Sequence, residues 1–144
     1  MPQNKAGLAI RTAFYEYLLI TIPVGLYIGL EAKHEHNWAL LVHSPEWAVA
    51  TIFLLFQGVY LYVRHMSGAG AKISPVSMGL LALVSLTLIA FTVINAYTSL
   101  DPVENTTGAI IFRLGLFITT SGGFIVMVAG ANLYHLKKET LAHG

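Results

Sequence analysis

The chain has 144 residues, of which 56% are hydrophobic and 10% are charged, and its formal net charge is +1. Soluble domains carry about 25% charged residues, so this composition excludes an ordinary soluble globular domain. The small net charge excludes a strongly basic surface, and we therefore predict no nucleic-acid partner. The absence of cysteine excludes disulfides, thiolate metal ligands and cysteine nucleophiles.

Four apolar stretches fill most of the chain, over residues 13–30, 45–63, 76–100 and 108–134. A helix of about 20 residues crosses a hydrocarbon core about 30 Å thick, and each stretch is about that length or longer. The mean hydropathy of +0.68 agrees with this reading. The sequence therefore predicts an all-α, four-helix (tetraspan) integral membrane bundle, built as a single transmembrane domain over residues 1–144, with the lipid bilayer as its surroundings.

The first stretch carries both a charge and a close-packing motif. It contains Glu16 and is longer than the hydrophobic segment of a signal peptide, about 7–15 residues, so we read it as a retained span. Pro23 removes a backbone donor and favours a kink. Gly25 and Gly29 have the GxxxG spacing that lets helices approach closely in membranes.

Histidines gather in the connection that follows. His34, His36 and His43 stand near Glu35, and neutral imidazole with carboxylate suits zinc or copper. The spacing is not diagnostic, because the HExxH pattern would need a histidine where Trp38 stands. A metal site, a pH-responsive loop and ordinary solvated histidines are the three interpretations of this segment.

The second stretch adds a polar side chain at a depth similar to that of Glu16. Gln57 lies about two helical turns before the end of this stretch, and Arg64 and His65 follow it. An ionised carboxylate inside a membrane is costly unless it is paired or hydrated. We therefore treat Glu16 as a candidate proton or cation site that Gln57 could hydrogen-bond, with a structurally paired acid as the alternative.

The fourth stretch presents a broad face of small residues at 100° per residue. Its members are Gly115, Thr119, Gly122, Gly123, Val126, Ala129 and Gly130. Small residues let helix backbones approach where the hydrophobic effect supplies no driving force. The face predicts helix packing, either inside one bundle or between subunits.

Arg113 lies about 200° around the fourth stretch from Gly115 and so is not on that face. A charge at this depth should pair with an acid or extend to the lipid headgroups. Asp101 and Glu104, in the preceding connection, are the expected partners. An anion-selecting ring of arginines in an oligomer is the functional alternative.

Two further histidines, His65 and His135, fall near the same ends of the second and fourth stretches. Paired histidines at one depth could hold a haem between helices. Their place beside basic residues at the water boundary favours anchoring instead, and we predict no resident cofactor.

Basic residues are distributed unevenly between the two sides of the predicted bundle. One side carries Lys5, Arg11, Arg64, Lys72, Lys137 and Lys138, and the other has Lys33 in its connections with Arg113 just inside the fourth stretch. Cytoplasmic loops are enriched in such residues. We therefore predict a multi-pass membrane protein with both termini in the cytoplasm.

No nucleophile elbow, phosphate-binding loop or recognisable acid pair is present, and no catalytic residue is predicted. The pattern favours a non-enzymatic membrane protein that acts as a homo-oligomer, with a pore or channel-like subunit as the most concrete form. An accessory or scaffolding subunit of a larger membrane complex is the alternative. A haem- or metal-binding redox component is a second alternative.

Overall fold

The computed structural model describes residues 4–98 and 106–143, and all regular secondary structure in this part of the chain is helical. The helices are α1 (Lys5–His34), α2 (Leu40–His43), α3 (Glu46–Gly68), α4 (Pro75–Thr98) and α5 (Thr107–His143). The prediction of an all-α chain is confirmed.

Four helical segments of the described chain are long and apolar enough to cross a membrane, namely Lys5–His34, Leu40–Gly68, Pro75–Thr98 and Thr107–Glu139. They coincide with the four apolar stretches, and three of them run well beyond the predicted ends. The 37 residues of α5 make a rod about 55 Å long at 1.5 Å per residue, which exceeds the thickness of a hydrocarbon core.

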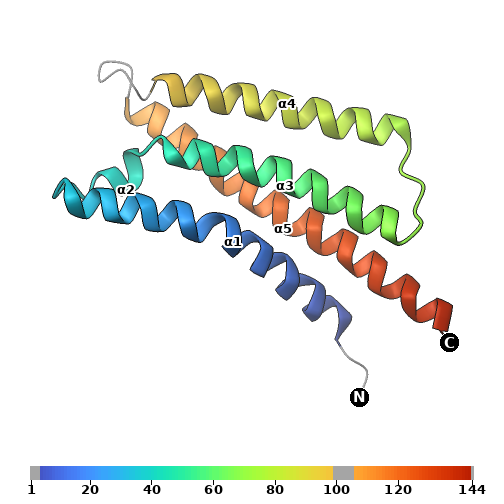
Figure 1. The fold of residues 1–144 in the computed structure, drawn as a ribbon. Helices are drawn as coiled ribbons and strands as arrows, with labels where there is room; N and C mark the ends of the chain where they lie inside the picture. Colours follow the sequence, from blue (N-terminus) through green and yellow to red (C-terminus); the bar gives the residue numbers. More distant parts are fainter. Residues whose placement is uncertain (1–3, 99–105, 144) are drawn as a thin grey trace.

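The long helices lie side by side in alternating directions, so both chain termini are at the same end of the bundle (Figure 1). We call this the terminal end. The opposite end, where α2 lies and α5 begins, we call the loop end. The most extensive contacts join α5 to α3 and to α1, while α4 lies along the far side of α3 and touches α5 less.

Local sequence signals explain where the helices begin. Asn4 caps α1, because its side chain accepts a hydrogen bond from the amide of Gly7 at 3.1 Å. Ser74 caps α4 in the same way, accepting from the amide of Ser77 at 3.0 Å. Such caps satisfy amides that have no partner within the first helical turn.

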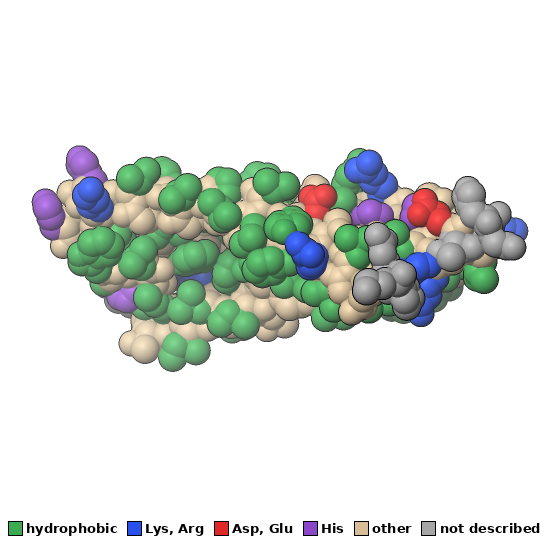
Figure 2. Space-filling view, turned by 90° about the horizontal axis from the view of Figure 1, so that it is seen from below, with side chains coloured by type: hydrophobic (Ala, Val, Ile, Leu, Met, Phe, Trp, Pro, Cys, Tyr) green, Lys and Arg blue, Asp and Glu red, His purple; other side chains and the backbone are tan. Residues whose placement is uncertain are grey.

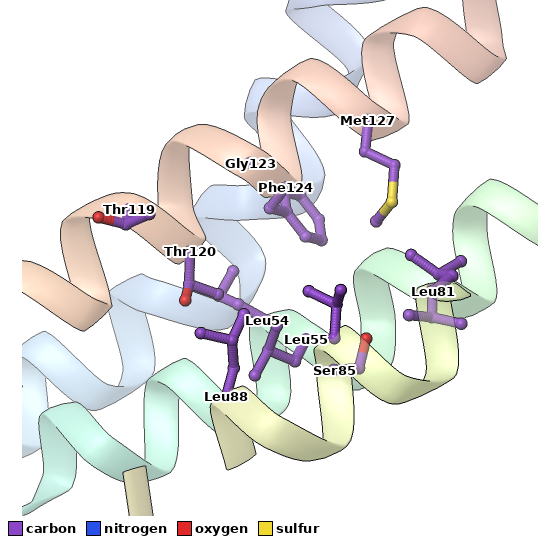
Figure 3. Close-up of a pocket in the computed structure, with 12 residues that line it drawn as sticks. Leu54, Leu55, Leu81, Ser85, Leu88, Thr119, Thr120, Gly123, Phe124 and Met127 are labelled. Carbon is purple, nitrogen blue, oxygen red and sulfur yellow. The ribbon is translucent and has the colours of Figure 1, made fainter. Parts of the chain in front are cut away.

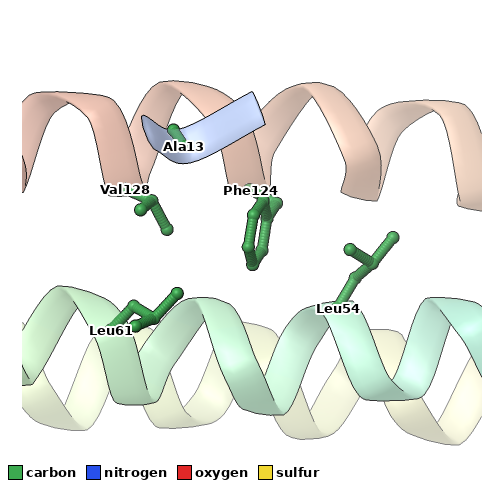
Figure 4. Close-up of a cluster of buried hydrophobic side chains, with 5 residues drawn as sticks. All are labelled: Ala13, Leu54, Leu61, Phe124 and Val128. Atoms are coloured by element: carbon green, nitrogen blue, oxygen red, sulfur yellow. The ribbon is translucent and has the colours of Figure 1, made fainter. Parts of the chain in front are cut away.

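The core lies between α1, α3 and α5 (Figure 4). Phe124 and Val128 of α5 point toward Leu54 and Leu61 of α3, and Ala13 closes the cluster from α1. All five side chains are at most 3% exposed, so the centre of one protomer is filled and contains no axial channel at this level.

Large hydrophobic side chains are exposed on every long helix, including Leu19 at 72%, Phe56 at 62% and Tyr97 at 74%. Figure 2 shows one face on which hydrophobic side chains dominate, with histidine and lysine at one tip and most other charged side chains toward the terminal end. A surface of this kind suits a lipid environment, since a soluble monomer rarely exposes so large an apolar area.

Burial is uneven along α4. Its only buried residues are Thr92 and Asn95, which both lie near the loop end. The rest of α4, toward the terminal end, is exposed or half-buried. The bundle therefore consists of three closely packed helices and a fourth that is held mainly at one end.

Candidate functional site

The most buried charge in the described chain is Arg113, whose side chain is 1% exposed. Its Nε donates to Oδ1 of Asn95 at 2.9 Å, and its Nη1 donates to the carbonyl oxygen of His43 at 2.7 Å. A longer contact of 3.4 Å joins Nη2 to the carbonyl of Asn95. One guanidinium thus links α5 to α4 and to the end of α2.

Asn95 completes this group, because its amide nitrogen donates to the carbonyl of Ala109 at 3.0 Å. Its side chain therefore accepts from Arg113 and donates to the backbone of α5. The carboxylate of Glu46, in the first turn of α3, interacts electrostatically with Arg113 and accepts a hydrogen bond from Ser44. We call Arg113, Asn95 and Glu46 the loop-end polar group.

The acids expected to pair with Arg113, Asp101 and Glu104, lie outside the described residues. The structure places the guanidinium inside the protomer rather than at its surface, so it does not extend toward headgroups. Three of its nitrogens are already engaged. The arrangement favours a structural role at the junction of α2, α4 and α5 over anion selection.

A second polar group lies at the terminal end. The rings of His65 on α3 and His135 on α5 meet edge to face, with centroids 6.3 Å apart. Glu16 of α1 interacts electrostatically with His65, and Nδ1 of His135 lies 3.5 Å from Oε1 of Glu139. The sequence predicted Glu16 and His65 at a similar depth. In the structure the carboxylate of Glu16 interacts electrostatically with the imidazole of His65.

This terminal-end group is more open than the group around Arg113. Glu16 and His65 are half-buried and Arg64 is exposed, so water can reach the charges. Gln57 is also half-buried, and no hydrogen bond to Glu16 is seen within residues 4–98 and 106–143. The group is therefore open to solvent, unlike the group around Arg113.

A haem is difficult to place between His65 and His135. The Nε2 atom of His135 would lie only 3.3 Å from a Cβ added at Gly68, so this imidazole packs against the backbone of α3. A macrocycle would have to enter between α3 and α5, the two helices that contact each other most extensively. The redox alternative therefore gains no support from this geometry.

The connection histidines do not converge. His34 and His36 are exposed, and His34 Nδ1 lies 3.3 Å from Oε1 of the adjacent Glu35. His43 contributes its backbone carbonyl to Arg113. Within the described residues no three His, Cys, Asp or Glu side chains are grouped to hold a metal ion, so a metal site here stays a prediction.

The glycines predicted to pack closely against other helices have no close neighbour in the described chain. A Cβ added at Gly25 or Gly29 of α1 would meet no heavy atom of the described chain within 4 Å, and the same holds for four of the five glycines of α5. Those are Gly115, Gly122, Gly123 and Gly130. Packing inside the bundle, one of the two interpretations, is therefore not how the structure uses them.

The close approach instead occurs at Gly58 of α3. A Cβ there would lie 3.0 Å from atoms of both Phe124 and Met127. Sequence spacing does not distinguish Gly58 from other glycines, because Gly58 lacks a GxxxG partner. Its packing role depends on the rotation of α3 toward α5, which only tertiary contacts specify.

Comparison with protein-family models, curated proteins and solved structures finds no match to this chain. The arrangement of the chain's own residues is therefore the basis for a functional proposal.

Proposed function

We propose that this protein is a non-enzymatic membrane protein that acts as an assembly of copies of itself. The observation that supports the proposal is the small-residue face of α5, defined by Gly115, Thr119, Gly122 and Gly130. All four residues are exposed, and this face points away from the side of α5 that carries Phe124 and Val128. A second copy of the chain is the proposed occupant.

An exposed glycine in a lipid-facing helix lowers helix stability unless it makes a close contact. Glycine costs about 1 kcal/mol relative to alanine in a helix interior, so repeated glycines on one face need a compensating gain. Close backbone contact with another helix supplies that gain in membranes, through dispersion forces and weak Cα–H hydrogen bonds. Inside the protomer only Gly58 obtains such a contact along the middle of the helices.

The more specific form of the proposal is a pore between copies. The core of Leu54, Leu61 and Phe124 closes the centre of the protomer, so a conducting path would have to run along protomer boundaries. Symmetric association around an axis is the usual way for small subunits to enclose such a path. Under this proposal both termini are cytoplasmic, in line with the distribution of basic residues.

The oligomeric state of Gly122→Leu in lipid bilayers tests the proposal. The bulky side chain would hold a second helix away from α5 without touching the protomer's own packing, so we expect a shift from oligomer to monomer. Gly79→Leu on α4 is the matched control, because Gly79 is also exposed with no neighbour within 4 Å of an added Cβ. Subunit counting by single-molecule photobleaching measures both.

Equal subunit counts for the wild type and Gly122→Leu would contradict self-association through this face. Co-purification of one different protein in fixed ratio, lost in Gly122→Leu, would favour the accessory-subunit alternative instead. Ion flux into liposomes that disappears together with the oligomer would support the pore. Oligomers that give no flux over a range of voltage and pH would agree with self-association and would contradict the pore.

A further inference from the structure

A cavity of about 230 Å³ lies between α3, α4 and α5 near the middle of the bundle (Figure 3). Hydrocarbon side chains make up most of its wall, among them Leu54, Leu88 and Phe124. No charged side chain of the described residues lines it. The cavity exists because α4 is held near the loop end and packs less closely against α3 and α5 elsewhere.

One polar atom in this wall has no partner. Thr120 is 6% exposed, and its hydroxyl is buried without a hydrogen bond in the described structure. Six other helical hydroxyls donate to the carbonyl four residues earlier, which satisfies them within their own helix. These are Thr12, Thr21, Thr51, Thr87, Thr92 and Ser121.

Thr120 thus departs from the pattern of its own chain, and its hydroxyl points toward Leu54 and Leu88 on the cavity wall (Figure 3). Ser85 of α4 supplies a second hydroxyl, which points into the cavity from the opposite wall, whereas the hydroxyl of Thr119 points away. A buried hydroxyl without a partner is destabilising, and a bound molecule that brings an acceptor would remove that cost.

We propose that this cavity binds a small lipophilic ketone, of one or two fused rings, whose carbonyl oxygen accepts a hydrogen bond from Thr120. The size follows from volume, since a dry apolar cavity of about 150 Å³ holds benzene and this one is larger. The single oxygen follows from one buried, unpaired donor in a wall that is otherwise mostly apolar.

Other occupants fit less well. An acyl chain fills an apolar space but leaves the Thr120 hydroxyl without a partner. A phospholipid headgroup is charged and resides at the membrane surface, whereas Thr120 lies near the middle of α5.

Binding of radiolabelled α-tetralone to the full chain in lipid nanodiscs tests the proposal, with empty nanodiscs as the correction for partitioning. Tetralin, which has the same ring system without the carbonyl, serves as the matched competitor. We expect saturable binding of about one α-tetralone per protomer, and weaker competition by tetralin.

Three variants separate the contribution of the Thr120 hydrogen bond from that of the cavity volume. Thr120→Val keeps the shape and removes the hydroxyl, so α-tetralone binding should weaken about 5- to 10-fold, the effect of one neutral hydrogen bond, with tetralin unchanged. Gly123→Leu places a side chain in the cavity that Gly123 lines and should abolish binding of both. Thr87→Val, where the hydroxyl bonds Leu83 on an exposed face, should change neither.

Absence of saturable α-tetralone binding to the wild type would overturn the proposal. So would equal affinity of the wild type and Thr120→Val, which would mean that the hydroxyl does not face the ligand. Because valine is nearly isosteric with threonine, a folding failure is not expected for this variant. Thr120 is not on the small-residue face that Gly122→Leu tests, so the result for Thr120→Val is independent of self-association. Gly123 was placed on that face, so Gly123→Leu tests the cavity only where the subunit count is unchanged.

Discussion

The two halves of α4 are held in different ways. Near the loop end, Thr92 and Asn95 are buried, and Asn95 exchanges hydrogen bonds with Arg113 and with the backbone of α5. Along its middle and toward the terminal end, the same helix borders cavities and grooves of about 230, 340 and 390 Å³, and a more open groove of about 320 Å³ lies beside Val93 and Tyr97 near the loop end. A polar contact of fixed geometry thus positions one end of the helix, while the other end leaves room for a ligand.

The contrast shows how a buried charge positions helices in a bundle whose surface is largely apolar. Apolar side chains gain little by leaving lipid for the bundle interior, so they specify weakly where α4 should lie. A guanidinium with three directed hydrogen bonds specifies one position. Where no such group exists, α4 packs less completely.

The largest effect on this contrast is expected from Asn95→Leu. The substitution removes the acceptor of the Arg113 Nε and the donor to the carbonyl of Ala109, and leaving such buried groups unsatisfied costs about 3 kcal/mol when one of them is charged. We expect a clear loss of unfolding free energy in mixed detergent micelles, and loss of the contact between α4 and α5.

Arg113→Met is the informative companion to Asn95→Leu. It removes the charge together with its desolvation cost, so the loss of stability should be smaller than for Asn95→Leu. The reverse order would mean that the guanidinium contributes through packing rather than through its hydrogen bonds, and the comparison between the two halves of α4 would lose its basis.

A smaller effect is expected from Gly58→Ala. The added methyl group would lie 3.0 Å from atoms of Phe124 and Met127, and overpacking of this kind costs about 1–3 kcal/mol. Gly79→Ala on α4 is the control, since an added Cβ there meets nothing within 4 Å and alanine favours helix. Chemical unfolding should show destabilisation for Gly58→Ala and none for Gly79→Ala.

The smallest effect is expected from Ser74→Ala, at the loosely held end of α4. It removes the cap on the amide of Ser77, at a cost of about 1 kcal/mol. Because this end of α4 has few tertiary contacts, the loss should remain local. Hydrogen exchange should accelerate in the first turn of α4 while protection near Asn95 is unchanged. Acceleration along the whole helix would show that α4 behaves as one unit.

Sequence reasoning recovered the helices better than the site. The four apolar stretches are local properties, and the structure has helices where they predict them, although α1 begins at Lys5, before its predicted start. Sequence depth also placed Glu16 and His65 at one level, which the structure supports. Depth also placed Asn95 at the same end as Arg113, but the expected partners of Arg113 were acids, because the relative rotation of two helices cannot be read from either one.

The glycines show the same boundary between local and tertiary information. The spacing of Gly25 and Gly29 predicted close packing, yet the close contact inside the protomer is at Gly58. Neither spacing nor charge distinguishes Thr120 in the sequence. Its significance appears only when its hydroxyl is found without a partner beside a cavity.

The sequence by itself determined an all-helical chain with four segments able to cross a membrane, because hydropathy and helix length are properties of each segment alone. The tertiary structure decided which polar groups meet, which glycine is in close contact and where a cavity remains. Those features depend on how helices are rotated and spaced against one another. In lipid, that arrangement is specified by a few directed contacts, here chiefly the bonds between Arg113 and Asn95, rather than by apolar pattern.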